Sequence, residues 1–123
     1  MVTSDLFVGF RGKPQGLEAF LDENGYELVN DEANHKVFEP KSDVDIIDIT
    51  LFYHPDSVIK EDDENYEDYY WKAYPDVTST LNISFDPIPR GEEAIRIAEL
   101  VTKKFNGVYY DPGLELYFEA RDL

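Results

Sequence analysis

Carboxylates are the most abundant reactive groups in this chain of 123 residues, which has 27 acidic and 11 basic residues. The run Glu-Asp-Asp-Glu-Asn-Tyr-Glu-Asp at 61–68 concentrates six of the acidic side chains. Oxygen ligands at this density suit a hard cation such as calcium. The spacing departs from a calcium-binding EF-hand loop, because the sixth position is not glycine and the twelfth is not a carboxylate. We therefore expect no dedicated metal site and no cofactor.

The loop 9–16 is the second place where residue types suggest chemistry. Its sequence, Gly-Phe-Arg-Gly-Lys-Pro-Gln-Gly, joins a predicted strand to a predicted helix and carries two basic residues. Phosphate-binding loops have this context. The Walker pattern requires a hydroxyl residue after the lysine, whereas Pro14 follows Lys13 here. We interpret the glycines as turn residues.

The remaining polar residues form no recognisable catalytic group. His35 falls in a predicted turn and His54 at the end of a predicted strand, and neither belongs to a motif with a nucleophile. The chain has no cysteine, which excludes disulfides and thiolate chemistry. Carboxylates are so numerous that no pair of them is diagnostic of acid–base catalysis. We therefore predict that the protein is not an enzyme.

The formal net charge of -16 restricts the partners. Such a surface repels the phosphates of nucleic acids and of anionic membranes, and it attracts basic proteins. The first residues show no signal-peptide pattern, and no apolar run approaches the length of a membrane span. We therefore expect a cytoplasmic protein that binds neither nucleic acid nor membrane.

An internal repeat indicates one domain, 1–123, built of two similar halves. Residues 10–20 align with residues 85–95 at a constant offset of 75, with Phe, Pro, Gly, Glu and Ala shared. Each half then ends its predicted helix with Asn-Gly, at 24–25 and again at 106–107. The sequence thus predicts two βαβ-like halves, about 5–53 and 79–119, joined by an acidic and aromatic linker at 54–78.

Hydrophobic periodicity predicts the elements that these halves contain. Two such halves give an α+β fold, a ferredoxin-like two-layer sandwich with an antiparallel sheet and two main helices on one face. The other face of the sheet is then open unless the linker covers it. The expected order is strand 6–10, helix 14–24, strands 27–29, 36–38 and 47–54, strand 81–85, helix 89–106, and strands 108–110 and 114–119.

The linker 54–78 contains a predicted short extra helix, because its tyrosines recur at helical spacing from 66 to 74. In one interpretation this helix lays its tyrosines on the sheet and exposes its carboxylates. In the other, the acidic and aromatic side chains dock a basic partner. The candidate partner-binding residues are Glu61, Asp62, Asp63, Glu64, Tyr66, Glu67, Asp68, Tyr70 and Trp71.

Residues 98–112, Ala-Glu-Leu-Val-Thr-Lys-Lys-Phe-Asn-Gly-Val-Tyr-Tyr-Asp-Pro, resemble a segment of small bacterial proteins of the toxin-immunity and uncharacterised types. In those proteins a helix ends in an aromatic-x-Gly sequence, and a strand and Asp-Pro follow. The resemblance implies action by binding, and immunity proteins to basic nuclease toxins are commonly acidic.

The leading hypothesis is a non-enzymatic protein that binds a basic protein partner through acidic and aromatic surface. One alternative is a small-ligand-binding or enzymatic domain, with a pocket on the open sheet face. A second alternative is a DNA mimic, and a homodimer formed through the sheet also stays open. The residues expected to line the pocket of the first alternative are Phe7, Arg11, Phe52, Asn82 and Tyr117.

Overall fold

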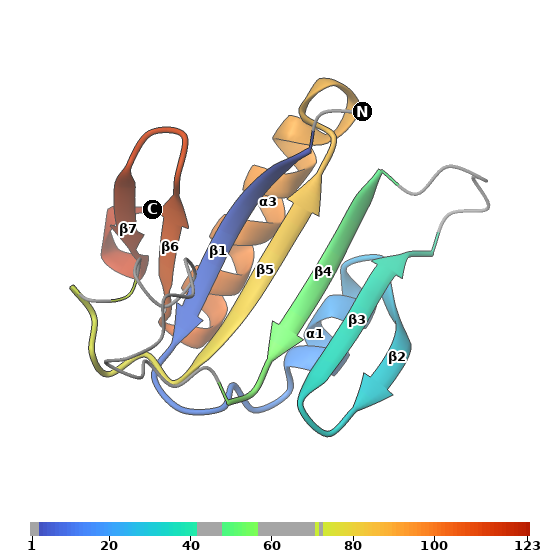
Figure 1. Ribbon diagram of the computed structural model, residues 1–123, viewed down its shortest axis with the longest axis horizontal. Helices are drawn as coiled ribbons and strands as arrows, with labels where there is room; N and C mark the ends of the chain where they lie inside the picture. Colours follow the sequence, from blue (N-terminus) through green and yellow to red (C-terminus); the bar gives the residue numbers. More distant parts are fainter. Residues whose placement is uncertain (1–2, 42–47, 57–70, 72) are drawn as a thin grey trace.

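The computed structural model describes residues 3–41, 48–56, 71 and 73–123. The described strands form one antiparallel sheet of seven strands, in the order β2-β3-β4-β5-β1-β6-β7 (Figure 1). This sheet and its helices confirm the α+β class. The elements are β1 (Ser4–Phe10), α1 (Leu17–Glu23), β2 (Tyr26–Glu32), β3 (His35–Pro40), β4 (Ile49–His54), β5 (Ser79–Phe85), α3 (Pro87–Phe105), β6 (Val108–Asp111), β7 (Leu116–Glu119) and a short 3-10 helix (Ala120–Asp122).

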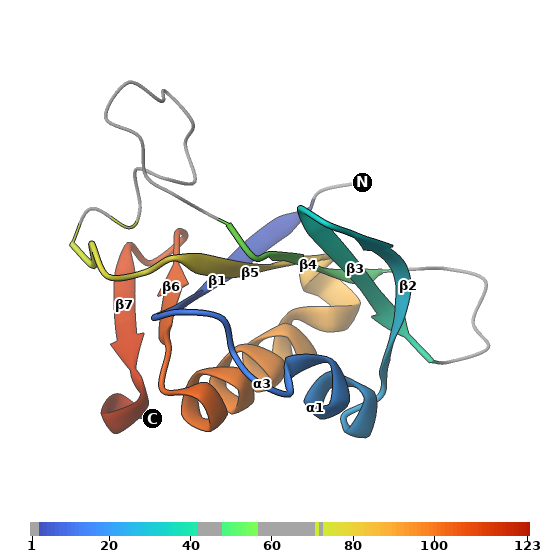
Figure 2. The same cartoon turned by 90° about the horizontal axis from the view of Figure 1, so that it is seen from below.

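Both described α-helices lie on the same side of the sheet (Figure 2), over the face that carries the main hydrophobic core. On β1, the alternate residues Leu6, Val8 and Phe10 belong to the main core and are at most 3% exposed. In α3, Ala94 and Ile97 lie about one turn apart and have no exposed surface. The strand and helix periodicities read from the sequence therefore meet in one core.

The helices begin at residues other than the predicted ones. The helix α1 begins at Leu17 and not at Pro14, because Gly16 has a left-handed conformation, φ 83°, at the position before it. The helix α3 begins at Pro87, two residues earlier than expected. The side chain of Asp86 caps it by accepting a hydrogen bond from the backbone N–H of Ile88. A proline suits this first turn because its missing N–H would have no partner there.

The ferredoxin-like topology is not confirmed, because the sheet is larger and its order is different. The helix α1 leads to β2 at the outer edge, and β3 and β4 then return step by step to β5. The burial of the strands explains this order. In β4 three alternate residues are buried, as a central strand requires, whereas most residues of β2 are exposed. The strand β4, and not β2, therefore lies beside β5.

The two strands that the offset of 75 relates, β1 and β5, are neighbours at the centre of the sheet. Leu6 pairs with Ile83, and Val8 pairs with Leu81. The offset of 75 relates Leu6 to Leu81 and Val8 to Ile83, so it converts one pair into the other with the two strands exchanged. Phe7 and Asn82, which are also 75 residues apart, pair between them. This pairing agrees with a local twofold relation of the two strands, and the repeat of whole halves stays a prediction.

The face of the sheet opposite the helices carries a row of side chains that crosses six strands. Part of this outer face is covered by Trp71, which is 1% exposed and packs in a cluster with Phe7 and Val77. A Cβ atom at Gly9 would lie 2.8 Å from the Trp71 ring, so the indole rests on the bare backbone of β1. The row, in order of strand pairing, is Val37, Phe52, Asn82, Phe7, Tyr110 and Tyr117.

Candidate interaction site

A cleft opens where β1 and β6 part. The strand β6 pairs with residues 7–9 of β1 and not with residues 4–6, because the chain turns away after Asp111. The cleft has a volume of about 470 Å³. Its described walls come from residues 3–7, from Phe85 and the first turns of α3, and from the turn 111–113. The cleft thus joins three parts of the chain that are far apart in sequence.

The turn 111–113 is held by its own aspartate. One carboxylate oxygen of Asp111, Oδ1, accepts hydrogen bonds from the backbone N–H groups of Gly113 at 2.9 Å and Leu114 at 3.3 Å. Aspartate commonly stabilises a turn in this way. This bonding fixes the position of the Asp111 carboxylate in the wall of the cleft.

The start of α3 at this cleft offers no free backbone N–H group to an anion. Pro87 and Pro89 have no N–H, and the N–H of Ile88 donates to the Asp86 side chain. The N–H of Arg90 donates to the backbone carbonyl of Asp86 at 3.0 Å. The usual reason for anion binding at a helix N-terminus is therefore missing here.

Two carboxylates line the cleft, and its described lining contains no lysine or arginine. Burial raises the pKa of Asp5, and the hydroxyl of Ser84, its pairing partner on β5, opposes this shift. In the described part of the chain, neither Asp5 nor Asp111 forms an ion pair. Among the described residues, the cleft is therefore an acidic site without an internal counter-ion.

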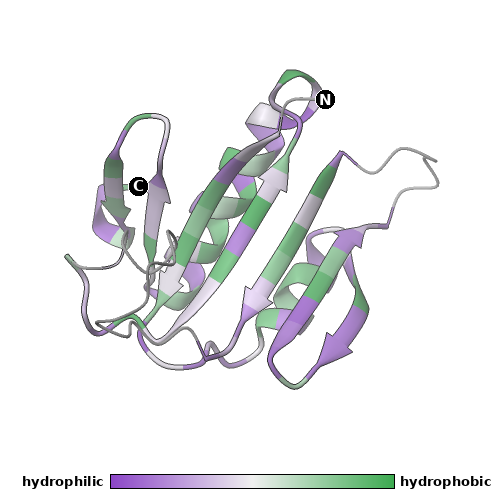
Figure 3. Ribbon diagram, in the orientation of Figure 1, coloured by the Kyte–Doolittle hydropathy of each residue, from purple (hydrophilic) through white to green (hydrophobic). Residues whose placement is uncertain are grey.

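Most of the exposed large hydrophobic residues adjoin this cleft. Among the described residues, Ile88 is 94%, Leu114 62%, Leu116 50% and Ile95 43% exposed. Ile95 lines the cleft, Ile88 and Leu114 directly follow lining residues, and Leu116 pairs with Asp111. Figure 3 shows apolar colour on β7 and a short apolar patch within the otherwise polar start of α3. The fifth such residue, Val29, lies on the edge strand β2. We call the four residues beside the cleft the apolar rim.

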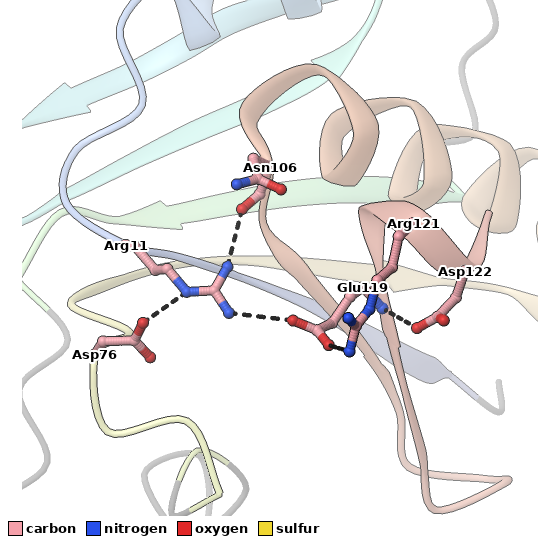
Figure 4. Close-up of polar contacts among 6 residues, drawn as sticks. All are labelled: Arg11, Asp76, Asn106, Glu119, Arg121 and Asp122. Atoms are coloured by element: carbon pink, nitrogen blue, oxygen red, sulfur yellow. Dashed lines mark hydrogen bonds and ion pairs between the residues drawn. The ribbon is translucent and has the colours of Figure 1, made fainter.

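The basic residue expected in a ligand pocket, Arg11, is instead held by other parts of the protein (Figure 4). Its Nε donates to Asp76 Oδ2 at 2.6 Å, and one terminal nitrogen donates to the backbone carbonyl of Asn106 at 3.1 Å. The other terminal nitrogen donates to Glu119 Oε1 at 3.4 Å. Arg11 thus connects the end of β1 with the segment before β5, the end of α3 and β7.

Four of the five residues expected to line a pocket on the open sheet face do lie together on that face. They are members of the row across six strands, and Arg11, which follows the end of β1, is not. One atom of the row, Asn82 Oδ1, is buried and has no hydrogen-bond partner among the described residues. Phe7 is the one residue of this predicted set that also lines the cleft described above.

The predicted partner-binding residues are mostly beyond what the structure describes. The run 61–68 and Tyr70 lie outside the described residues, as does most of the predicted extra helix. Trp71 is described, and it is packed on the sheet with its Nε1 buried and with no acceptor in the described part of the chain. A partner could therefore contact the indole only after it leaves this position.

Sequence reasoning missed two features that the fold creates. The rings of His35 and His54 stack, with centroids 6.0 Å apart, because β3 and β4 pair. The apolar rim was also missed, although Ile88 between two prolines was a signal. In the described residues, no group of three or more histidine, aspartate or glutamate side chains could hold a metal ion.

No protein-family model, no curated protein and no solved structure matches this chain. In the part of the chain that the structure describes, none of the helices combines the length and the apolar character needed to cross a membrane. A function must therefore be inferred from the geometry and charge of the site itself.

Proposed function

We propose that the protein is a non-enzymatic binding domain whose partner is a basic protein. The observation that carries this proposal is the apolar rim. Of the five large hydrophobic side chains exposed in the described residues, Ile95 lines one acidic cleft, and three others lie next to its lining residues in the chain or in the sheet. Exposed apolar residues gathered at one place, and not scattered singly, are typical of a protein interaction site.

The distribution of charge supports a basic partner. The described ranges contain 19 acidic and nine basic residues. Seven of these nine form ion pairs with carboxylates, and the two that do not, Lys103 and Lys104, lie in the last turn of α3. The cleft lies at the first turns of that helix. A cationic surface would therefore meet an uncompensated negative field on approaching it.

The resemblance of residues 98–112 to toxin-immunity proteins agrees with this function. A basic nuclease toxin would be a partner of the expected chemistry. The run 61–68 stays a predicted second contact region, and the proposal does not depend on it.

A small-ligand-binding function is the second candidate, and the cleft is the observation that favours it. A volume of about 470 Å³ is in the range of small-molecule sites, which are roughly 300–1,000 Å³. The apolar rim distinguishes the two candidates, because a small ligand inside the cleft has no need of exposed isoleucine and leucine outside it.

The rim can be tested by affinity capture from a bacterial lysate at about 50 and 300 mM NaCl, with quantification of each captured protein. The test variant carries Ile88→Ser and Leu114→Ser. The matched control is Val29→Ser, which removes a residue of similar exposure, 47%, at the far edge of the sheet. We expect basic proteins whose capture falls with salt and is lost in the rim variant but kept in the control. Equal capture by all three proteins would refute the proposal.

A further inference from the structure

We propose that the cleft between β1, α3 and the turn 111–113 receives a lysine or arginine side chain of the partner. This inference rests on the proposed function, in which the partner is basic. It adds the anchor residue by which that partner is recognised.

The two ends of a lysine or arginine side chain match the two kinds of wall in the cleft. Leu6, Phe85 and Ile95 are apolar and suit the aliphatic stem. Asp111 and Asp5 bring negative charge to the lining and suit the cationic head, with Asp5 contributing from the face of the sheet opposite to Leu6 and Phe85. A cleft of about 470 Å³ has room for such a side chain. An anionic ligand would meet both carboxylates without any compensating N–H group from α3.

The two carboxylates are prepared for an external cation. Asp111 Oδ1 is used by the turn, and no hydrogen bond is formed by its Oδ2 in the described residues. Asp5 is partly removed from water and has no cationic neighbour in the described lining. A desolvated carboxylate without a counter-ion costs stability in the free protein, and a bound ammonium or guanidinium group would offset that cost.

The backbone beside the carboxylates can hold the main chain that carries the side chain. Residues 4–6 pair with β5 on one side, and among the described strands none pairs with them on the side of the cleft. An extended peptide can bind to such an open strand edge through its main chain. Side-chain capture and main-chain pairing would then act at the same place.

Gly91 provides a way to close the cleft without changing its charge. It lines the cleft within α3, and a Cβ atom at this position would have no heavy atom within 4 Å. A leucine at 91 would therefore extend into the cleft, and it also favours the helix more than glycine does. The variant Gly91→Leu should fold, so loss of binding in it would report the loss of the cleft.

The direct test is a titration of the isotope-labelled protein, followed by NMR, with the capped tripeptides Gly-Lys-Gly and Gly-Arg-Gly. Gly-Glu-Gly is the matched anionic control, and butylamine is a free amine without a peptide backbone. We expect saturable shifts at Asp5, Gly91 and Gly113 with both cationic peptides, weaker binding of butylamine, and no binding of the anionic peptide.

Two isosteric variants test the carboxylates. We expect Asp5→Asn and Asp111→Asn each to weaken binding about fivefold, as the loss of one charge contact near the surface implies. Asp86→Asn is the matched control, because it removes one charge at the same helix end outside the described lining and keeps a capping side chain. It should bind within about twofold of the natural protein.

Absence of saturable binding, or equal weakening by Asp86→Asn, would overturn the inference. Butylamine binding as tightly as the lysine peptide would also overturn it, because the occupant would then be a free amine. Affinity capture separates this inference from the function on which it rests. If Gly91→Leu keeps the partners that the Ile88→Ser and Leu114→Ser variant loses, the cleft inference fails and the proposed function stands. If the rim variant keeps them too, the proposed function fails.

Discussion

Replacing Gly9 with alanine should destabilise the protein, because the Trp71 indole lies on the backbone of β1 at this residue. A Cβ atom there would be 2.8 Å and 2.9 Å from two ring atoms of Trp71 and 2.9 Å from Cγ1 of Val77. These distances are well below van der Waals contact, so the ring or the strand must move. Gly9 is in a central strand that is paired on both sides, which leaves the indole as the group that shifts.

The size of the effect follows from the two ways in which Trp71 can respond. If the ring adjusts within its cluster, overpacking costs about 1–3 kcal/mol. If the ring leaves the sheet, the protein loses a side chain that is 1% exposed, which costs at most about 3–5 kcal/mol. Alanine regains roughly 0.5–1 kcal/mol because glycine loses more conformational freedom on folding. We expect a net loss in the free energy of unfolding of roughly 0–2.5 kcal/mol if the ring adjusts, and of at most about 2–4.5 kcal/mol if the ring leaves the sheet.

Urea denaturation followed by fluorescence measures this directly, since Trp71 is the only tryptophan. Emission of the folded Gly9→Ala protein should shift to longer wavelength if the ring leaves the sheet. Gly91→Ala is the matched control, because its Cβ meets no atom within 4 Å and alanine favours the helix. The reasoning would be refuted by a Gly9→Ala protein with natural stability and unchanged emission.

Three further predictions concern polar groups. Burial raises the pKa of Asp5 above its ordinary value of 3.8. The protonated carboxyl group therefore contributes fully to stability below pH 3.8, and this contribution is lost as the pH rises through the raised pKa. Asp5→Asn should therefore raise the urea midpoint relative to the natural protein at pH 7, with the gain vanishing as the pH falls to about 3.8; an equal gain at both pH values would contradict this. Arg11→Gln should cost about 1 kcal/mol at 50 mM NaCl and less at 500 mM, because its ion pairs with Asp76 and Glu119 are partly exposed; a salt-independent loss would show that packing dominates. Tyr26→Phe should cost about 1 kcal/mol in thermal or urea unfolding, because it removes the 2.9 Å hydrogen bond from the phenol to Glu93 Oε1; unchanged stability would mean that the bond has no net value.

The strands and the long helix could be predicted because their information is local. In β4, Ile49, Leu51 and Tyr53 alternate with less buried residues, and the structure buries these three. The long helix α3 ends where Asn106-Gly107 predicted, with Asn106 in the left-handed conformation, φ 51°. Each of these features depends on a few neighbouring residues.

The order of the strands could not be read in the same way. The ferredoxin-like prediction named no strand order, and in the structure β4, whose alternate residues are buried, takes the position beside β5. The cleft was missed for a related reason. The turn after Asp111 is visible in the sequence, whereas the separation of that turn from residues 4–6 exists only in the assembled sheet. Both the strand order and the cleft depend on how segments far apart in the sequence pack together.

The close fit between Gly9 and Trp71 has a consequence for the accuracy of folding. A shift of β1 by two residues along β5 would keep every side chain on its own face, so the alternating pattern alone does not oppose it. Trp71 lies eight residues before Ser79, the first residue of β5, and the backbone N–H of Thr78 donates to the carbonyl of Phe10. After such a shift the indole would meet the side chain of Phe7 or Arg11 in place of bare backbone. The missing side chain at Gly9 thus opposes a two-residue shift between the two central strands, because after that shift a side chain would occupy the space of the indole.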